Sequence, residues 1–377
     1  MLDERKILVV VRWPLGGIRT YMRYMFSYFP ESFKLTLLAS STQEDSALRA
    51  DVNKYNAGLK LINVDNTIDF IKEIFYELRK IRYDLVVSQG LITFVAVYIA
   101  NLFIRVPHIL TIHGIVEDKY LTGHFKNIKK WILKKMISGV DVLYGVSNDI
   151  LEHIYEQFPK LRKKGPKPLV ILNGIDLNDL DSMPEERIDL RKYFGIDDNT
   201  FIFGFFGRFM PQKGFDLLID AVEKIKSEAP KQRVAVVAVG SGDYIREYRS
   251  IINKKGLEEY FYFLPFQPQV NYLYTQVNAV IMPSRWEASG LLAMEVLSLG
   301  VPLIASDCIG LRETVENTPT IIFHSESVDG LAEAMFNSIE VDPERFRQYA
   351  VEARRRYDVK KSSKAFAEFI EQELLEN

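Results

Sequence analysis

The chain has 377 residues, of which 47% are apolar and 26% charged, with a formal net charge of −2. This length exceeds one ordinary hydrophobic core and predicts two domains, while the balanced charge is typical of a globular protein and favours no nucleic-acid partner. The single Cys308 excludes a disulfide within the chain, so a reducing cytoplasmic setting is expected.

Neither the apolar run near the N-terminus nor the longest apolar stretch of the chain indicates a signal peptide or a membrane span. Asp3 and Glu4 interrupt the sequence before the apolar run 7–11. The longest apolar stretch, 91–104, is shorter than the roughly twenty residues that a membrane helix needs. A buried core helix is the expected structure there.

Short β-rich runs alternate with helical patterns through the first half of the chain, which indicates a parallel sheet covered by helices. A Rossmann-like domain is therefore expected over residues 1–174. The predicted strands are 6–11, 34–38, 84–88, 108–112, 141–146 and 169–172.

Two features follow predicted strands of this domain where a ligand-binding edge would lie. Gly16 and Gly17 precede a predicted helix, so the backbone and its free amides can approach a ligand closely, although a plain turn has the same pattern. They lack the three-glycine dinucleotide fingerprint, which argues against a nicotinamide cofactor. His113 and Gly114 follow the strand 108–112, and such a histidine either faces a ligand or serves as a structural hydrogen-bonding group.

The net charge hides a difference between the two halves. Residues up to Val170 carry 25 basic and 17 acidic side chains, whereas the remainder carries 23 and 33. A basic half suits an acidic partner such as an anionic membrane leaflet. Lysines cluster around apolar positions at helical spacing in 125–136, which indicates either a membrane-surface helix or a helix packed on the sheet with a solvated face. The lysines are Lys126, Lys129, Lys130, Lys134 and Lys135.

A polar, acid-rich segment, 175–200, is predicted to link the domains. Within it, Asp179 and Asp181 match the Asp-x-Asp pattern of metal-dependent sugar transferases. Asp residues in such a segment more often cap turns and helices, and the histidines and the cysteine form no cluster with ligand spacing. We therefore expect no metal site and no cofactor.

The second half repeats the alternation of strands and helices, which predicts a second Rossmann-like domain over 201–342. Helices in 343–377 are expected to cross back to the first domain. The predicted strands are 201–206, 234–239, 261–264, 279–283 and 302–305.

Two cations follow the first strand of this half, in the sequence Gly-Arg-Phe-Met-Pro-Gln-Lys-Gly at 207–214. Arg208 can grip phosphate oxygens through its planar fork, and Lys213 adds a point charge. Together they are candidates to neutralise a diphosphate, although such a turn is also common with a solvated lysine.

Two acids surround a predicted helix start after the strand 279–283. Glu287 lies in the loop, and Gly290 opens an apolar helix whose first amides, including that of Leu291, would favour an anion. Glu295 lies about a turn and a half into this helix. Two carboxylates beside a diphosphate would repel it unless they bind hydroxyl groups, which a nucleotide sugar carries at both ends; a loop Glu and a surface Glu would have the same spacing.

Taken together, these motifs resemble the retaining glycosyltransferases of family 4, whose signature is two acids separated by seven residues and preceded by an Arg and a Lys in a Gly-Arg…Lys-Gly turn. The resemblance covers nearly the whole chain. It implies the GT-B fold, in which two Rossmann-like domains face a central cleft, the first binding the acceptor and the second the nucleotide sugar.

The resemblance also implies roles for individual residues. Glu287 would orient hydroxyls of the donor sugar, Glu295 would bind the ribose, and His113 in the Thr-x-His-Gly motif would contact the donor sugar. Arg208 and Lys213 would stabilise the leaving diphosphate, and transfer would proceed with retention. The expected enzyme is a metal-independent hexosyltransferase of polysaccharide or glycolipid synthesis, cytoplasmic or peripheral at the inner face of the membrane, acting on a glycan or lipid-linked acceptor.

The sequence departs from the family pattern at two positions near the donor sugar. Ser289 stands where an aromatic residue is frequent, and Ile309 replaces one glycine of a common Gly-Gly pair. Both changes affect the expected sugar pocket, and a UDP-sugar is only slightly favoured over GDP-mannose.

Three alternatives share parts of this pattern. A non-catalytic scaffold protein of the same fold would typically lack the acids or cations, all of which are present. A sugar-nucleotide epimerase would bind the same donor but needs no acceptor. A glycan phosphorylase would need a lysine-bound pyridoxal phosphate and is usually much longer.

Overall fold

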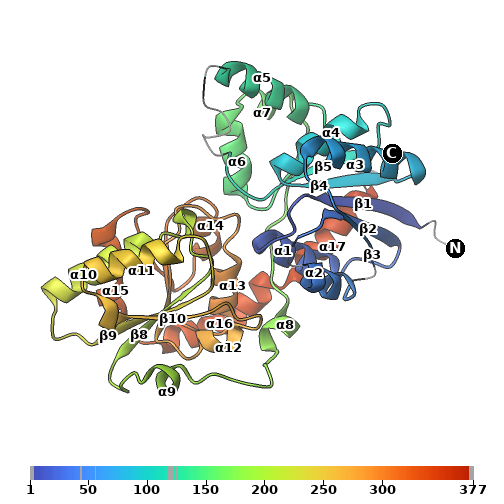
Figure 1. Cartoon of the computed structure of the whole chain (residues 1–377). Coiled ribbons are helices and arrows are strands. Elements are labelled where there is room, and N and C mark those ends of the chain that lie inside the picture. The colour runs from blue at the N-terminus through green and yellow to red at the C-terminus, as the bar shows by residue number, and fades with distance from the viewer. Residues whose placement is uncertain (1–3, 43–44, 56, 117–122, 124, 373–377) are drawn as a thin grey trace. The chain divides into compact units, whose positions relative to one another are not determined.

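The computed structural model describes residues 4–42, 45–55, 57–116, 123 and 125–372, which divide into two compact units (Figure 1). The first unit contains the described residues up to Gly174 and those from Val359 onward. The second comprises Ile175–Asp358. Each unit contains one parallel sheet with helices, so the predicted α/β class is confirmed.

The first unit has a seven-stranded parallel sheet in the order β3-β2-β1-β4-β5-β6-β7. Its strands are β1 (Arg5–Val11), β2 (Phe33–Ser40), β3 (Ala57–Ile62), β4 (Leu85–Gln89), β5 (His108–Ile112), β6 (Val142–Gly145) and β7 (Lys167–Val170). Its helices are α1 (Gly17–Phe26), α2 (Asp45–Val52), α3 (Thr67–Lys80), α4 (Leu91–Asn101), α5 (Lys126–Ile137), α6 (Asn148–Gln157), α7 (Leu161–Lys164) and α17 (Val359–Ile370).

Continuous apolar strands explain why this sheet is covered by helices. The central strand β1 is buried from Ile7 to Val11, as expected for a parallel strand with both faces packed. Phe70 and Ile74 of α3 are fully buried against strand residues. The final helix α17 also belongs to this core, because Phe366 contacts Tyr144 of β6 with ring centroids 5.1 Å apart.

The second unit has a six-stranded parallel sheet in the order β10-β9-β8-β11-β12-β13. Its strands are β8 (Phe201–Phe206), β9 (Val234–Val239), β10 (Phe261–Leu264), β11 (Ala279–Met282), β12 (Leu303–Ser306) and β13 (Ile321–Phe323). Its helices are α8 (Leu177–Asp181), α9 (Leu190–Phe194), α10 (Phe215–Glu228), α11 (Ile245–Lys254), α12 (Asn271–Tyr274), α13 (Leu291–Ser298), α14 (Leu311–Val315), α15 (Val328–Ser338) and α16 (Glu344–Tyr357), with 3₁₀ turns η2 (Pro211–Lys213) and η3 (Glu258–Tyr260).

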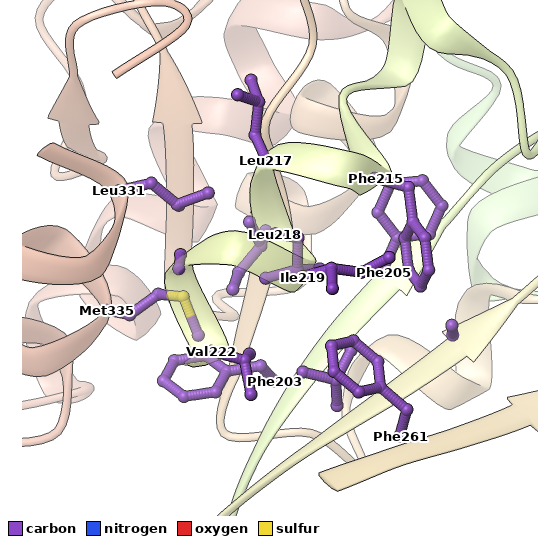
Figure 2. Close-up of a cluster of buried hydrophobic side chains, with 14 of the residues drawn as sticks. Phe203, Phe205, Phe215, Leu217, Leu218, Ile219, Val222, Phe261, Leu331 and Met335 are labelled. Atoms are coloured by element: carbon purple, nitrogen blue, oxygen red, sulfur yellow. The ribbon is translucent and has the colours of Figure 1, made fainter. Parts of the chain in front are cut away.

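The core of the second unit is built largely from α10 and the strands beneath it (Figure 2). Phe203 and Phe215 are fully buried, and Phe215 packs edge-to-face on Phe205 with ring centroids 4.8 Å apart. Leu331 and Met335 of α15 complete the cluster. This packing holds the ends of β8 and β11 in place, and the loops that follow them carry most of the predicted site.

The segment 175–200 packs on the second unit and forms α8 and α9. The side-chain amide of Asn271 donates to the carbonyl of Ser182 over 2.7 Å, and the backbone N–H of Leu190 donates to Gln276 over 2.9 Å. The chain leaves this unit after Asp358, so α16 lies in the second unit and α17 in the first.

The strand order changes direction once in each sheet, and predicted site residues follow the strand on at least one side of each such point. In the first sheet β2 and β3 extend to one side of β1 and β4 to β7 to the other. In the second sheet the change lies between β8 and β11. Open α/β sheets bind ligands at the carboxyl ends of the strands at such points.

Candidate functional site

Residues from the loops after β8 and β11 meet at the carboxyl edge of the second sheet. Lys213 ends the turn η2 after β8, and Glu287 lies in the loop between β11 and α13. The Lys213 Nζ atom is 2.7 Å from Glu287 Oε1, and Ser284 Oγ donates to the same oxygen over 2.6 Å. Parallel strands explain this meeting of residues 74 positions apart, since their ends lie side by side.

The ion pair is largely removed from solvent. The Glu287 side chain is 9% exposed and that of Lys213 is 24% exposed. A buried carboxylate needs compensating partners, and Lys213 with Ser284 supplies them. Lys213 is therefore not the solvated lysine of an ordinary turn, which was the alternative interpretation of its sequence motif.

Two glycines allow the backbone segments of this edge to approach each other. A Cβ atom on Gly214 would lie 1.9 Å from the carbonyl oxygen of Pro283, and one on Gly310 would lie 2.0 Å from that of Glu287. Both glycines have positive φ, at 64° and 79°. Gly310 is the glycine that the sequence retains beside Ile309, whose carbonyl accepts the N–H of Glu287 over 2.9 Å.

Helix α13 begins beside the ion pair and presents free amides there. Gly290 precedes the helix, and the described residues provide no acceptor for the N–H groups of Gly290, Leu291 and Leu292. Ser289 is buried, and its carbonyl accepts the hydroxyl of Thr314 over 2.7 Å. These amides, together with the helix dipole, favour an anion at this position.

Glu295 and Arg208 lie in different surroundings from the ion pair. Glu295, inside α13, accepts a hydrogen bond from the hydroxyl of buried Tyr274 over 2.9 Å, so its carboxylate is oriented. Arg208, the second residue after β8, is exposed, and no partner for its side chain occurs among the described residues. Because it is exposed, the Arg208 side chain can move to contact an anionic ligand bound at this edge.

The remaining predicted site residues lie in the first unit. Gly16, with φ 54°, precedes α1, and Gly17 is its first residue. His113 follows β5, and its Nε2 atom lies 2.6 Å from Oε1 of Gln89, at the end of β4. Burial lowers the pKa of His113 to about 3, so the imidazole is neutral at physiological pH.

Asp179 and Asp181 of the Asp-x-Asp pattern lie in helix α8, whose N-terminus is capped and whose last residue forms a salt bridge. The Asp176 side chain caps α8 by accepting the N–H of Asn178 over 2.9 Å. Asp181, at the end of α8, pairs with Arg354 of α16, which raises the pKa of that guanidinium. Across the residues that the structure describes, no group of three or more His, Cys, Asp or Glu side chains is arranged to hold a metal ion.

Three polar side chains that the motifs did not single out take part in these arrangements. Ser284 binds Glu287, Tyr274 binds Glu295, and Gln89 binds His113. Ser284 carries a usable signal, because it directly follows Pro283 at the end of a predicted strand. Tyr274 and Gln89 carry none, because both contacts join segments that are distant in sequence.

The second unit places free helix amides, a buried Lys–Glu pair and an exposed Arg at the switch point of its sheet, where open α/β proteins bind anionic ligands such as nucleotides. Two family models of known proteins match the chain. The model of glycosyltransferase family 4 matches residues 15–179, and that of the glycosyl transferases group 1 matches residues 186–356. The chain belongs to this family of glycosyltransferases.

Curated relatives are similar over part of their length. The chain is 26% identical over 286 residues to an alpha-maltose-1-phosphate synthase of Mycolicibacterium smegmatis, covering 70% of this chain and 71% of that protein. It is 26% identical over 238 residues to the O-antigen biosynthesis glycosyltransferase WclY of Escherichia coli, covering 60% of this chain and 62% of that protein. The match to WclY thus spans less than two thirds of its length.

Solved structures share the fold over almost the entire chain. Alr3699/HepE of Anabaena in complex with UDP and glucose superposes with a TM-score of 0.79 at 21% identity, covering 97% of this chain and 99% of that one. WaaG, a glycosyltransferase involved in lipopolysaccharide biosynthesis, superposes with a TM-score of 0.70 at 14% identity, covering 97% and 100%. The predicted GT-B fold class is confirmed.

Proposed function

We propose that this protein is a retaining glycosyltransferase that transfers a hexose from a UDP-sugar to a glycan or lipid-linked acceptor in cell-surface polysaccharide or glycolipid synthesis. The observation that carries the proposal is the cluster of Lys213, Glu287 and the free amides of α13 at one switch point. UDP is favoured because a protein of the same fold, HepE, is described in complex with UDP and with UDP-glucose.

Cleavage of the sugar–phosphate bond builds negative charge on the diphosphate and positive charge at the anomeric carbon. The amides of Gly290 and Leu291, with Lys213 and the exposed Arg208, stabilise the diphosphate. Because Lys213 and the amides are held by the fold before the donor binds, only the exposed Arg208 side chain needs to reorganise. This set of cations and amides supports a transfer that needs no metal ion.

The two glutamates act on hydroxyl groups. Glu287, held by Lys213 and Ser284, orients hydroxyls of the donor sugar and favours positive charge near the anomeric carbon. Glu295, oriented by Tyr274, binds the ribose hydroxyls. Neutral His113 donates its Nε2–H to Gln89, so its Nδ1 atom accepts a hydrogen bond from a hydroxyl of the donor sugar. Gly16 and Gly17 let α1 approach the substrates. In a retaining reaction the acceptor hydroxyl attacks from the face that the phosphate leaves.

Helix α5 supports a peripheral position at the inner face of a membrane. Three of its apolar side chains are exposed to solvent: Ile128 to 55%, Trp131 to 57% and Ile132 to 46%. Lysines surround them, and within α5 only Ile137 is buried. Apolar side chains ringed by cations match an anionic lipid surface. No helix among the described residues is long and apolar enough to span a membrane.

Binding and product analysis test the function. UDP, GDP and ADP should be compared for thermal stabilisation, since a ligand at 100 times its Kd adds about 2.7 kcal/mol to folding stability. Radiolabelled UDP-glucose, UDP-galactose and GDP-mannose should then be incubated with a membrane extract as the acceptor source. The expected result is stabilisation by UDP and transfer of label with the donor's anomeric configuration retained. An isomerised donor without transfer would identify an epimerase, and no use of any donor would favour the scaffold protein.

A further inference from the structure

A cavity of about 380 Å³ opens at the carboxyl edge of the first sheet, at its switch point between β1 and β4. Its lining comes from the ends of β1, β4 and β5 and from the helices α1, α4 and α5. Most lining side chains are apolar, including Trp13, Ile18, Ile92, Ile115 and Leu133. Such a cavity is of the size and polarity that binds a small organic group.

One buried polar side chain among the lining residues lacks a complete set of hydrogen-bond partners. Gln89 is 2% exposed and lines the cavity. Its Oε1 atom pairs with His113 Nε2, whereas its Nε2 atom has no hydrogen-bond partner among the described residues. Buried amide groups in native proteins are nearly always hydrogen-bonded. A ligand that supplies an oxygen atom here would therefore give the Gln89 amide its missing acceptor.

The charge of the lining side chains also restricts the chemical class of ligand that the cavity can bind. None of the described residues that line the cavity is Asp, Glu, Lys or Arg, and His113 is neutral. A phosphate would therefore find no counter-charge, and a bare sugar would leave several hydroxyls against apolar walls. An amphiphile, with a hydrocarbon part and an oxygen near Gln89, satisfies both parts of the cavity.

We propose that this cavity binds the hydrocarbon portion of a lipid-linked acceptor, with an oxygen at its polar end hydrogen-bonded to Gln89. This inference rests on the proposed transferase function and specifies its acceptor. Continuity with α5 supports a lipid over a soluble apolar molecule, because Leu133 of α5 lines the cavity while Ile128 and Ile132 of the same helix are exposed. A chain rising from the membrane would thus meet α5 first.

The test is the binding of n-alkyl glucosides to the whole protein in the absence of donor. Methyl, butyl, hexyl and octyl glucoside, each below its micelle concentration, should be titrated by calorimetry. Affinity should rise by about fourfold for each methylene group that becomes buried, until the cavity is filled. The heat capacity change should become more negative along the series. Affinity that is independent of chain length would overturn the proposal.

A matched pair of variants on α4 assigns the effect to this cavity. Ile92 and Ile99 are similarly exposed, at 39% and 41%, but only Ile92 lines the cavity. Ile92→Asn should flatten the dependence on chain length, and Ile99→Asn should leave it unchanged. Equal effects of the two substitutions would place the alkyl chain elsewhere and overturn the proposal. Gln89→Leu should lower the affinity for all four glucosides by about threefold to tenfold, the contribution of one hydrogen bond, while the dependence on chain length persists.

Failure of this inference is distinguishable from failure of the proposed function. If UDP stabilises the protein and label reaches the four glucosides with kcat/KM independent of chain length, the transferase stands and the lipid site is wrong. If the glucosides bind with the expected dependence but no nucleotide sugar is used, the cavity stands and the transferase is wrong. Preferential binding of soluble aromatic compounds over the octyl chain would also contradict a lipid acceptor.

Discussion

The two units use the same strand order around their switch points but fill the carboxyl edge with opposite chemistry. In the second unit the edge holds the buried pair of Lys213 and Glu287, together with free helix amides. In the first it holds apolar side chains around one incompletely paired amide, that of Gln89. The fold thus determines where a ligand binds in each unit, and the side chains after each strand determine which ligand.

The difference also determines how each edge is stabilised. Burying two charges costs a large desolvation free energy, which the attraction between the two partners offsets. The second edge is therefore sensitive to the loss of either partner. The apolar edge is stabilised by burial and tolerates exchange among side chains of similar volume. Substitutions in the two units should therefore differ both in kind and in size.

The largest effect is expected from Lys213→Ala. It removes a cation facing the charge that grows in the transition state and leaves Glu287 buried without its counter-charge. Transfer should fall by at least about 100-fold to 1,000-fold. Stability should fall by about 2–3 kcal/mol, at the low end for buried pairs because Lys213 is partly exposed. Steady-state kinetics and denaturant unfolding measure the two effects.

A double variant separates catalysis from stability in this prediction. Lys213→Met with Glu287→Gln removes both charges, so stability should recover while activity stays low. Near-normal activity in folded Lys213→Ala would exclude Lys213 from the site. Activity should also persist in excess chelator, and loss with EDTA that Mg²⁺ or Mn²⁺ restores would revive a metal role for Asp179 and Asp181.

The second-largest expected effect is on the binding of anionic vesicles by helix α5 of the first unit. Changing Lys129, Lys130, Lys134 and Lys135 to Gln should weaken binding to anionic vesicles by up to about 4 kcal/mol, at about 1 kcal/mol per lysine. Binding should also fall with added salt, since the screening length is about 8 Å at physiological ionic strength. Vesicle co-sedimentation measures both, and transfer to a soluble acceptor should be unaffected.

A charge-matched control uses four exposed lysines outside α5. Changing Lys192, Lys231, Lys254 and Lys364 to Gln alters the net charge equally and should leave vesicle binding nearly intact. If both sets weaken binding to the same degree, net charge and not α5 is responsible. Binding that ignores both salt and the α5 substitutions would mean that α5 is only a solvated face.

An intermediate effect is expected from Glu295→Gln. A hydrogen bond to a charged group contributes roughly 1.5–3 kcal/mol, so kcat/KM for the nucleotide sugar should fall about tenfold or more. Tyr274→Phe, which removes the group orienting Glu295, should show a smaller loss of the same kind. Glu333→Gln, at an exposed position of α15, is the matched control. Unchanged kinetics in folded Glu295→Gln would remove Glu295 from the site.

The smallest effect is a pH dependence of stability in the first unit. Burial lowers the pKa of His113 to about 3, below the usual value of about 6.5. Between these values the unfolded chain binds a proton that the folded chain does not, so stability falls as pH decreases through this window. His113→Gln should reduce the drop in Tm between pH 7 and pH 5 by a few degrees at most. An identical drop in both proteins would show that His113 does not resist protonation.

Most of the fold was predictable because buried parallel strands are continuous apolar runs. Every predicted strand is present, with its ends shifted by at most two residues. The strands β3 and β13 were missed, and both lie at sheet edges. β3 is mostly half-buried and β13 has three residues, so neither has the continuous apolar run by which the others were recognised.

The candidate site was predicted as a set of residue types, without the contacts that orient them. Arg208, Lys213, Glu287 and Glu295 follow from local motifs, because a strand end and a helix start lie close together in sequence. The motifs treated Lys213 as a phosphate ligand and gave no sign that it bonds Glu287. The apolar cavity beside Gln89 had no sequence signal at all, since its lining comes from five separate stretches of the chain.

The sequence by itself determined the alternation of strands and helices, the family and the charged residues of the second unit, because each is encoded by neighbours within about ten positions. Tertiary structure alone decided which of those residues meet: Lys213 with Glu287, Tyr274 with Glu295, and Gln89 with His113. The physical reason is that a parallel sheet gathers the carboxyl ends of strands from distant parts of the chain at one edge. Whether that edge is polar or apolar depends on which loops the strand order places side by side.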